Sequence, residues 1–199
     1  MTLRHIAIGR GIQNYTCSQT NATAPPVSIG AVATLYNASC IASAYPDLLA
    51  QLPAVALQFN LTSPTQKALS AANLAISGQH FFTNNTTPAF NLDLSAENLG
   101  FAQFHKNGTA GAPKGSVVGQ AGEGLGAVAW LKLVANEGQT GGLKEVYRLN
   151  TAGGMQPATC AGMPAQFEIQ YSAEYVFPLF KTCIGHPLTL NHRYWFYEV

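Results

Sequence analysis

The sequence predicts an all-β fold, a single-domain sandwich or barrel with one or two short helices. Short segments rich in β-branched and aromatic residues alternate in polarity, and Gly, Pro and Asn separate them along the chain. Few segments have a helical pattern. With 199 residues, the chain is long enough to bury a core of its own, so we expect one β-rich domain spanning residues 1–199.

The predicted elements follow from these patterns. Strands are expected at Ser28–Tyr36, Ala54–Leu61, Ala89–Leu94, Leu99–His105, Val128–Val134, Lys144–Leu149 and Phe167–Phe177. Helices are expected at Pro46–Leu52 and Thr65–Ala75. The glycine-rich stretch Lys106–Gly126 predicts a long surface loop or hairpin. The aromatic segment His192–Tyr197 is predicted to cover the core as an edge strand, or to offer a stacking platform.

Seven Asn-x-Ser/Thr sequons indicate passage through a eukaryotic secretory pathway. Chance would give about one or two in a chain of this composition. We therefore expect a glycoprotein that is secreted, extracellular or held in the cell wall. The sequons begin at Asn14, Asn21, Asn37, Asn60, Asn84, Asn85 and Asn107.

Four cysteines in such a chain favour two disulfides. Three pairings are open, and we predict Cys17–Cys40 with Cys160–Cys183, because this choice closes two loops of similar length. A zinc site is less consistent with the chain, since no Cys-x-x-Cys pair exists and the spacings are long. We expect no metal.

Charge and hydropathy exclude two classes of partner. The formal net charge is +1 and only 10% of the residues are charged, so no basic surface is available for nucleic acid. No apolar run is long enough to span a bilayer, so no membrane span is expected.

Gly122–Ala127 matches the dinucleotide-binding pattern G-x-G-x-x-A by its letters. That site also needs a strand before the glycines and a helix after them. The following segment, AVAWLKLV, is rich in valine and reads as a strand instead. We therefore expect no nicotinamide cofactor and no other cofactor.

No local catalytic motif appears. The histidines form neither H-x-H nor H-E-x-x-H, and the absence of G-x-S-x-G argues against an α/β-hydrolase. His80 lies in a predicted strand and is either a core histidine or a proton-transfer residue beside Glu174, Asp93 or His105.

Glycoside hydrolysis needs two carboxylates that meet in space. The candidates are Asp93, Glu97, Glu123, Glu145, Glu168 and Glu174.

The stretch Tyr147–Gly154 is the most distinctive in the chain, because a strand runs into a Gly-Gly turn with an arginine before it. An arginine in a chain with so few charges faces solvent or pairs with an acid. Arg148 is thus expected to anchor the turn through Glu174 or Glu168, or alternatively to hold a ligand.

Five segments form an ordered set of motifs: Ile8–Cys17, which contains G-x-Q-x-Y-x-C, then Gly78–Phe82, Val128–Leu133, Val146–Gly154 with Pro157 and Cys160, and Tyr171–Phe177. This set resembles a secreted fungal and bacterial family of unknown function whose members are often auto-named malate dehydrogenase. The motifs cover nearly the whole chain. The resemblance implies no activity, and the nicotinamide fold implied by that name has no support in the residues above.

Two hypotheses for function follow. The first is an extracellular or cell-wall protein that binds a carbohydrate or a small ligand, with aromatic side chains such as Trp130, Tyr175 and Trp195 stacking on a sugar. The second is a secreted enzyme acting on a carbohydrate or a small molecule through His80, Arg148 and Glu174 in one pocket. The candidate ligand-binding residues are His80, Trp130, Arg148, Glu174 and Tyr175.

Overall fold

The computed structural model describes residues 3–59, 68–69, 74–94, 98–119 and 125–178. Three short helices occur early in the chain: α1 (Ser39–Ala44), α2 (Pro46–Leu49) and α3 (Leu52–Leu57). The strands are β1 (Leu3–Thr16), β2 (Val27–Asn37), β3 (Ala68–Leu69), β4 (Leu74–Phe82), β5 (Pro88–Asn91), β6 (Phe101–Ala110), β7 (Trp130–Ala135), β8 (Glu145–Gly153) and β9 (Gln166–Pro178). The predicted all-β class is confirmed.

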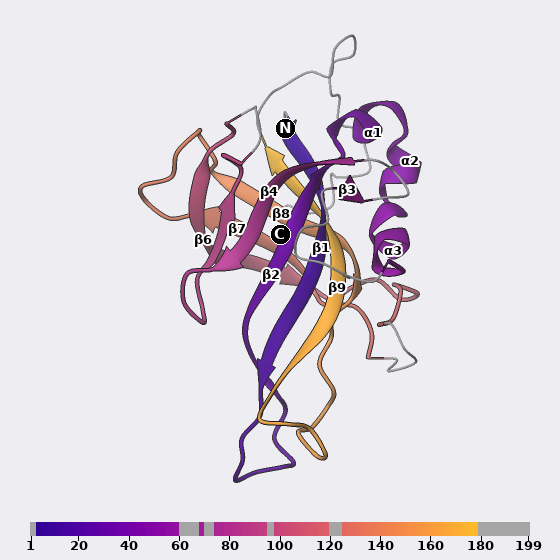
Figure 1. Cartoon of the computed structure of the whole chain (residues 1–199), viewed down its shortest axis with the longest axis vertical. Coiled ribbons are helices and arrows are strands. Elements are labelled where there is room, and N and C mark those ends of the chain that lie inside the picture. The colour runs from indigo at the N-terminus through magenta and orange to yellow at the C-terminus, as the bar shows by residue number, and fades with distance from the viewer. Residues whose placement is uncertain (1–2, 60–67, 70–73, 95–97, 120–124, 179–199) are drawn as a thin grey trace.

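The strands close into an antiparallel barrel (Figure 1). The order β2-β1-β9-β8-β7-β6-β5-β4 is completed by a pairing of β2 with β4, while β3 pairs with β4 alone. Most strands that are neighbours in the barrel are also consecutive along the chain. The exceptions are the pair β1 and β9 and the pair β2 and β4, between which β3 lies in the sequence. An even number of strands lets first and last meet antiparallel, so the two ends of the described chain seal the barrel.

Side chains fill the interior of the barrel. On β9, Tyr171, Ala173, Tyr175 and Phe177 alternate with residues of the opposite face and join a core with Phe90 and its neighbours. The rings of Phe104, Tyr175 and Phe177 each meet the ring of Phe90 edge to face. A barrel of this size has room for packed side chains or one small ligand, and here aromatic rings occupy its centre.

The three helices cover the outer wall of the barrel beside β1 and β9 (Figure 1). Ile6 and Ile8 of β1 pack there with Leu49, Leu52 and Ala56. These residues form a second apolar cluster, separate from the interior one, so β1 is buried on both faces.

Arg10 lies under the C-terminal end of α3 and is only 1% exposed. Its guanidinium donates to the carbonyl oxygens of Ala56, at 3.0 Å, and Phe59, at 2.9 Å, and also to the amide oxygen of Gln170. Burial lowers its pKa to about 10, so the side chain is a cation at neutral pH. The guanidinium donates to carbonyls at the C-terminal end of the helix, and its positive charge complements the negative end of the helix dipole.

Beyond the barrel, three strands continue as a ribbon. In this three-stranded ribbon, Ile12–Thr16 of β1 lie between Val27–Val32 of β2 and Gln166–Gln170 of β9. No described strand pairs with the outer edge of either neighbour there. The disulfide Cys17–Cys160 joins the tip of the ribbon to the loop before β9.

The predicted disulfide pairing is wrong. Cys17 bonds to Cys160, not to Cys40, because β1 ends beside the start of β9, where Thr16 pairs with Gln166. Cys40 is also disulfide-bonded. Cys183, the predicted partner of Cys160, lies outside the described residues.

Two predicted elements also differ. Ala54–Leu61 was expected to be a strand, but α3 occupies Leu52–Leu57, with Pro53 in its first turn and Leu52, Ala56 and Leu57 buried at helical spacing. Where the predicted helix Thr65–Ala75 is described, Ala68–Leu69 and Leu74–Ala75 form strand pairs. The tail after Pro178, including Trp195, lies outside the described residues. Within the described part of the chain, none of the helices has the length and apolar character needed to cross a membrane.

Candidate functional site

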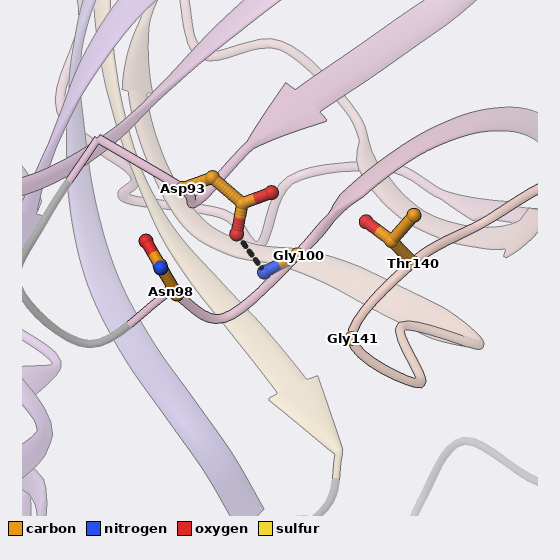
Figure 2. Close-up of a pocket in the computed structure, with 5 residues that line it drawn as sticks. All are labelled: Asp93, Asn98, Gly100, Thr140 and Gly141. Atoms are coloured by element: carbon orange, nitrogen blue, oxygen red, sulfur yellow. Dashed lines mark hydrogen bonds between the residues drawn. The ribbon is translucent and has the colours of Figure 1, made fainter.

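The described surface has a depression of about 330 Å³ between two loops at one end of the barrel (Figure 2). One loop joins β5 to β6 and the other joins β7 to β8. Its lining is small and polar: Asp93, Asn98, Gly100, Thr140 and Gly141.

Hydrogen bonds between backbone and side chains fix the shape of this depression. The Gly100 amide donates to the Asp93 carboxylate at 2.6 Å, as the dashed line in Figure 2 shows. Thr140 holds the second loop against Phe101, because its hydroxyl accepts from the Phe101 amide at 2.8 Å and its own amide donates to the Phe101 carbonyl at 2.8 Å.

The two loops approach so closely that only glycine fits where they cross. A Cβ on Gly141 would lie 2.2 Å from the Leu99 carbonyl oxygen, and a Cβ on Gly100 would lie 2.4 Å from that of Thr140. Both glycines have positive φ, 62° and 112°, which L side chains rarely adopt. The depression is therefore built into the backbone of both loops.

The groups that line the depression suit a ligand with several hydroxyls. They offer one carboxylate, one carboxamide and one hydroxyl, and no described histidine, cysteine or acid gathers with Asp93 as a metal cluster. Beside them, Phe101 follows Gly100 directly, and its ring stacks with Phe81 at 6.4 Å. Both rings are half-buried, and neither lines the depression.

Three of the predicted ligand-binding residues meet inside the barrel rather than at this surface. His80 is 3% exposed, stacks on Phe90 at 4.2 Å and contacts the ring of Tyr175. Arg148 is half-buried, and its Nε and Nη2 both donate to the Ala129 carbonyl, at 3.2 and 2.8 Å. The predicted ion pair of Arg148 with Glu174 or Glu168 is not formed.

Burial sets the protonation of these interior groups. The pKa of His80 is lowered to about 4, mainly by burial and in smaller part by the nearby Arg148 charge, while a hydrogen bond from Nδ1 to the Ala89 carbonyl opposes the shift. Burial also raises the pKa of Tyr175, whose hydroxyl lies 2.8 Å from that of Tyr171. At neutral pH the cluster therefore holds a neutral imidazole and neutral phenols around one guanidinium.

Glu174 lies on the other face of the sheet. Its neighbours Ala173 and Tyr175 point into the barrel, whereas Glu174 points outward and accepts from Asn150 at 2.7 Å. It is fully buried there. The barrel wall separates its carboxylate from His80 and Arg148, so the three groups do not share a pocket.

Trp130 lies on the outer wall as well, half-buried against the apolar cluster beneath the helices. Next to it, Lys132 pairs with Glu145 at 3.3 Å and lies 5.6 Å from the centre of the Tyr147 ring. This outward group is exposed to solvent in part and does not extend to the depression at Asp93.

A family model of proteins of unknown function, DUF3455, matches residues 1–178. The chain belongs to this family. The match covers every described strand and helix, so the family corresponds to the whole barrel with its helical layer. No curated protein and no solved structure matches the chain.

Sequence reasoning missed most of the depression. The sequence offers Asp93 only as a partner of His80 or as one of several carboxylates, and it does not indicate Asn98 or Thr140. The available signal was weak: two glycine-containing loops, Asn98–Gly100 and Thr140–Gly142, at the ends of predicted strands. Their proximity follows from β6 pairing with β7, which brings both loops to the same end of the barrel.

Proposed function

We propose that the protein is a secreted glycoprotein, outside the cell or in the cell wall, that binds a carbohydrate or another small polar ligand without turnover of its own. The observation that carries this proposal is the depression at Asp93, whose polar groups are held in place by hydrogen bonds to the backbone. A carboxylate accepts hydrogen bonds from hydroxyls, and a carboxamide both donates and accepts them, so these groups suit a sugar or another ligand with several hydroxyls.

The positions of the potential catalytic groups support binding over catalysis. A general acid or base must reach the substrate, but His80 is enclosed by Phe90, Phe82 and Tyr175. Glu174 faces away from it across the barrel wall. An enzyme based on His80, Arg148 and Glu174 would need these groups on one accessible surface.

Absence of nicotinamide binding is part of the same proposal. Residues 122–124 of the glycine motif Gly122–Ala127 lie outside the described residues, but the segment that follows the motif forms β7, not a helix. A helix N-terminus at that place is what would hold the pyrophosphate. Calorimetric titration with NAD is expected to show no heat of binding, and micromolar affinity would contradict this part.

The test is a glycan array combined with calorimetry on the purified protein and on Asp93→Asn. This substitution keeps an oxygen that accepts from Gly100 and removes the charge from the depression. We expect the bound glycan to lose at least tenfold in affinity, with an unchanged melting temperature.

The matched control is Asp47→Asn on helix α2, an exposed carboxylate away from the depression, which is expected to bind as the original does. Equal loss in both variants would place the ligand elsewhere. Release of new products from cell-wall polysaccharide, abolished by His80→Ala or Glu174→Gln in folded protein, would instead favour the enzyme.

A further inference from the structure

The sequons lie in different structural settings, although their letters are alike. Six of the seven begin at a described residue, and Asn60 lies outside the described residues. Two of the six form closed turns in exposed loops, and two are built into the packed fold. The sequence cannot distinguish these settings, because both use the same Asn-x-Ser/Thr pattern.

Asn21 and Asn84 have the same turn. The Asn21 side-chain oxygen accepts from the amide and the hydroxyl of Thr23, at 3.1 and 2.8 Å. The Asn84 oxygen accepts from the amide and the hydroxyl of Thr86, both at 2.9 Å. Both asparagines are exposed, and the turn uses only their oxygen. The amide nitrogen that would carry a sugar is left out of the turn.

Asn14 and Asn37 are half-buried and belong to strands of the sheet. Asn14 lies within β1, paired with Gly30 on one side and Glu168 on the other, and its side-chain oxygen is buried. Asn37 ends β2, and its oxygen accepts from the Ser39 amide at 2.9 Å, as in the turns of Asn21 and Asn84, but the Ser39 hydroxyl contacts Ile6 and not Asn37. The Ser39 hydroxyl is buried against the Ile6 amide, so the third position of this sequon is inside the fold.

We propose that the folded protein carries N-linked glycans on Asn21 and Asn84 and that Asn14 and Asn37 stay unmodified. This inference rests on the secretory route proposed above. In the reaction, Asn Nδ2 forms a bond to C1 of an oligosaccharide, the C1–oxygen bond to a diphosphate-linked lipid donor breaks, and the amide proton leaves to a base of the transferase. Asn85 and Asn107 are exposed, but neither accepts from its own sequon threonine.

The fold selects between these sites after transfer as well. A glycan on Asn21 or Asn84 projects from a loop and leaves every described strand pair intact. A glycan on Asn14 would attach to a side chain whose oxygen is buried, and one on Asn37 would disturb the contact of Ser39 with β1. Chains modified at those positions are expected to misfold and to be retained before secretion.

The experiment is site mapping on protein secreted by a eukaryotic host. Enzymatic removal of glycans in isotopically heavy water labels each formerly occupied asparagine as heavy aspartate, which peptide mass spectrometry locates. We expect label on the peptides of Asn21 and Asn84 and none on those of Asn14 and Asn37.

Variants give an independent readout of glycan number by gel mobility. Thr23→Ala and Thr86→Ala are each expected to remove one glycan, and Thr86→Ala leaves the Asn85 sequon intact. The matched controls Thr23→Ser and Thr86→Ser keep the hydroxyl and are expected to keep the glycan. Thr16→Ala, which abolishes the Asn14 sequon, is expected to leave mobility unchanged.

Glycan on Asn14 or Asn37 in secreted, folded protein would overturn the choice of sites while leaving the secretory route in place. The same holds if label appears only at Asn85 or Asn107. Efficient secretion with no label on any sequon would overturn the choice of sites together with the proposal that the protein is a glycoprotein.

Discussion

His80 is the residue whose protonation the barrel controls most strongly. Burial among aromatic rings lowers its pKa from 6.5 to about 4. Between these values the unfolded chain binds a proton that the folded chain excludes, so the free energy of unfolding falls as pH falls from 6.5 towards 4. The full effect is about 3 kcal/mol. Urea unfolding at a series of pH values measures it.

Two variants isolate this contribution from that of the carboxylates. His80→Phe keeps a ring in the interior and is expected to remove the extra slope between pH 6.5 and about 4. His105→Gln replaces an exposed histidine that hydrogen-bonds Asn136, and it is expected to retain the slope. If both variants keep the slope, His80 is not the group that titrates.

Arg10 is expected to contribute more to stability than any other cation of the described chain. Arg10→Ala leaves the carbonyls of Ala56 and Phe59 without their donor beneath α3, and we expect a loss of about 3–5 kcal/mol. Arg148→Ala, at a half-buried site with one carbonyl acceptor, is expected to cost about 1–2 kcal/mol. Chemical denaturation of both variants compares them, and the reverse order would contradict this assignment.

At the scale of an element, the loop between β7 and β8 offers a paired test of the depression. Gly138 and Gly141 both have positive φ, but only Gly141 has backbone atoms where a Cβ would lie. Gly138→Ala is expected to cost about 1 kcal/mol through backbone strain alone, and Gly141→Ala about 3 kcal/mol. Thermal unfolding measures both, and Gly141→Ala is also expected to abolish ligand binding at Asp93.

The strands that the sequence predicts well are those with clear alternation. β2, β8 and β9 lie within a few residues of their predicted ranges, because apolar residues face the interior and others face solvent or the helices. β1 was not predicted. Its interior face carries Gly9 and Gly11, and its outer face carries Arg10 and isoleucines. Because the helices cover the outer face, both faces are buried, and the sequence lacks the alternation of apolar and polar residues that marks a half-exposed strand.

For the whole molecule, the pairing of β1 with β9 determines the covalent links. Cys17–Cys160 closes a loop of 143 residues, and the chain-entropy model gives it about 5 kcal/mol of stabilisation. We expect the double substitution Cys17→Ser with Cys160→Ser to lower the free energy of unfolding by a large part of this stabilisation, as measured by denaturant unfolding.

Non-reducing peptide mapping checks the connectivity itself. A peptide pair linked through Cys17 and Cys160 is expected. A Cys17–Cys40 peptide would contradict the pairing of the first and last strands of the barrel.

The candidate site could be predicted only in part, and the reason lies in topology. His80, Arg148 and Tyr175 do meet, because all three point inward from strands of one closed sheet. Glu174 is one residue from Tyr175, yet this single step along a strand moves it to the opposite face. The depression at Asp93 depends on which loops share an end of the barrel, which no local pattern in the sequence specifies.

Closing the sheet removes the edges of the barrel, but the three-stranded ribbon exposes edges again. On the side of β2 that faces away from β1, the backbone donors and acceptors of Val27–Val32 pair with no described strand. This segment contains no charged residue. Such an edge is a template for a strand from another molecule. A glycan on Asn21, in the loop at the same tip, would sterically hinder a strand of another molecule from pairing with this edge. Protein made without glycans is therefore expected to self-associate through this edge as its concentration rises, and light scattering would detect it.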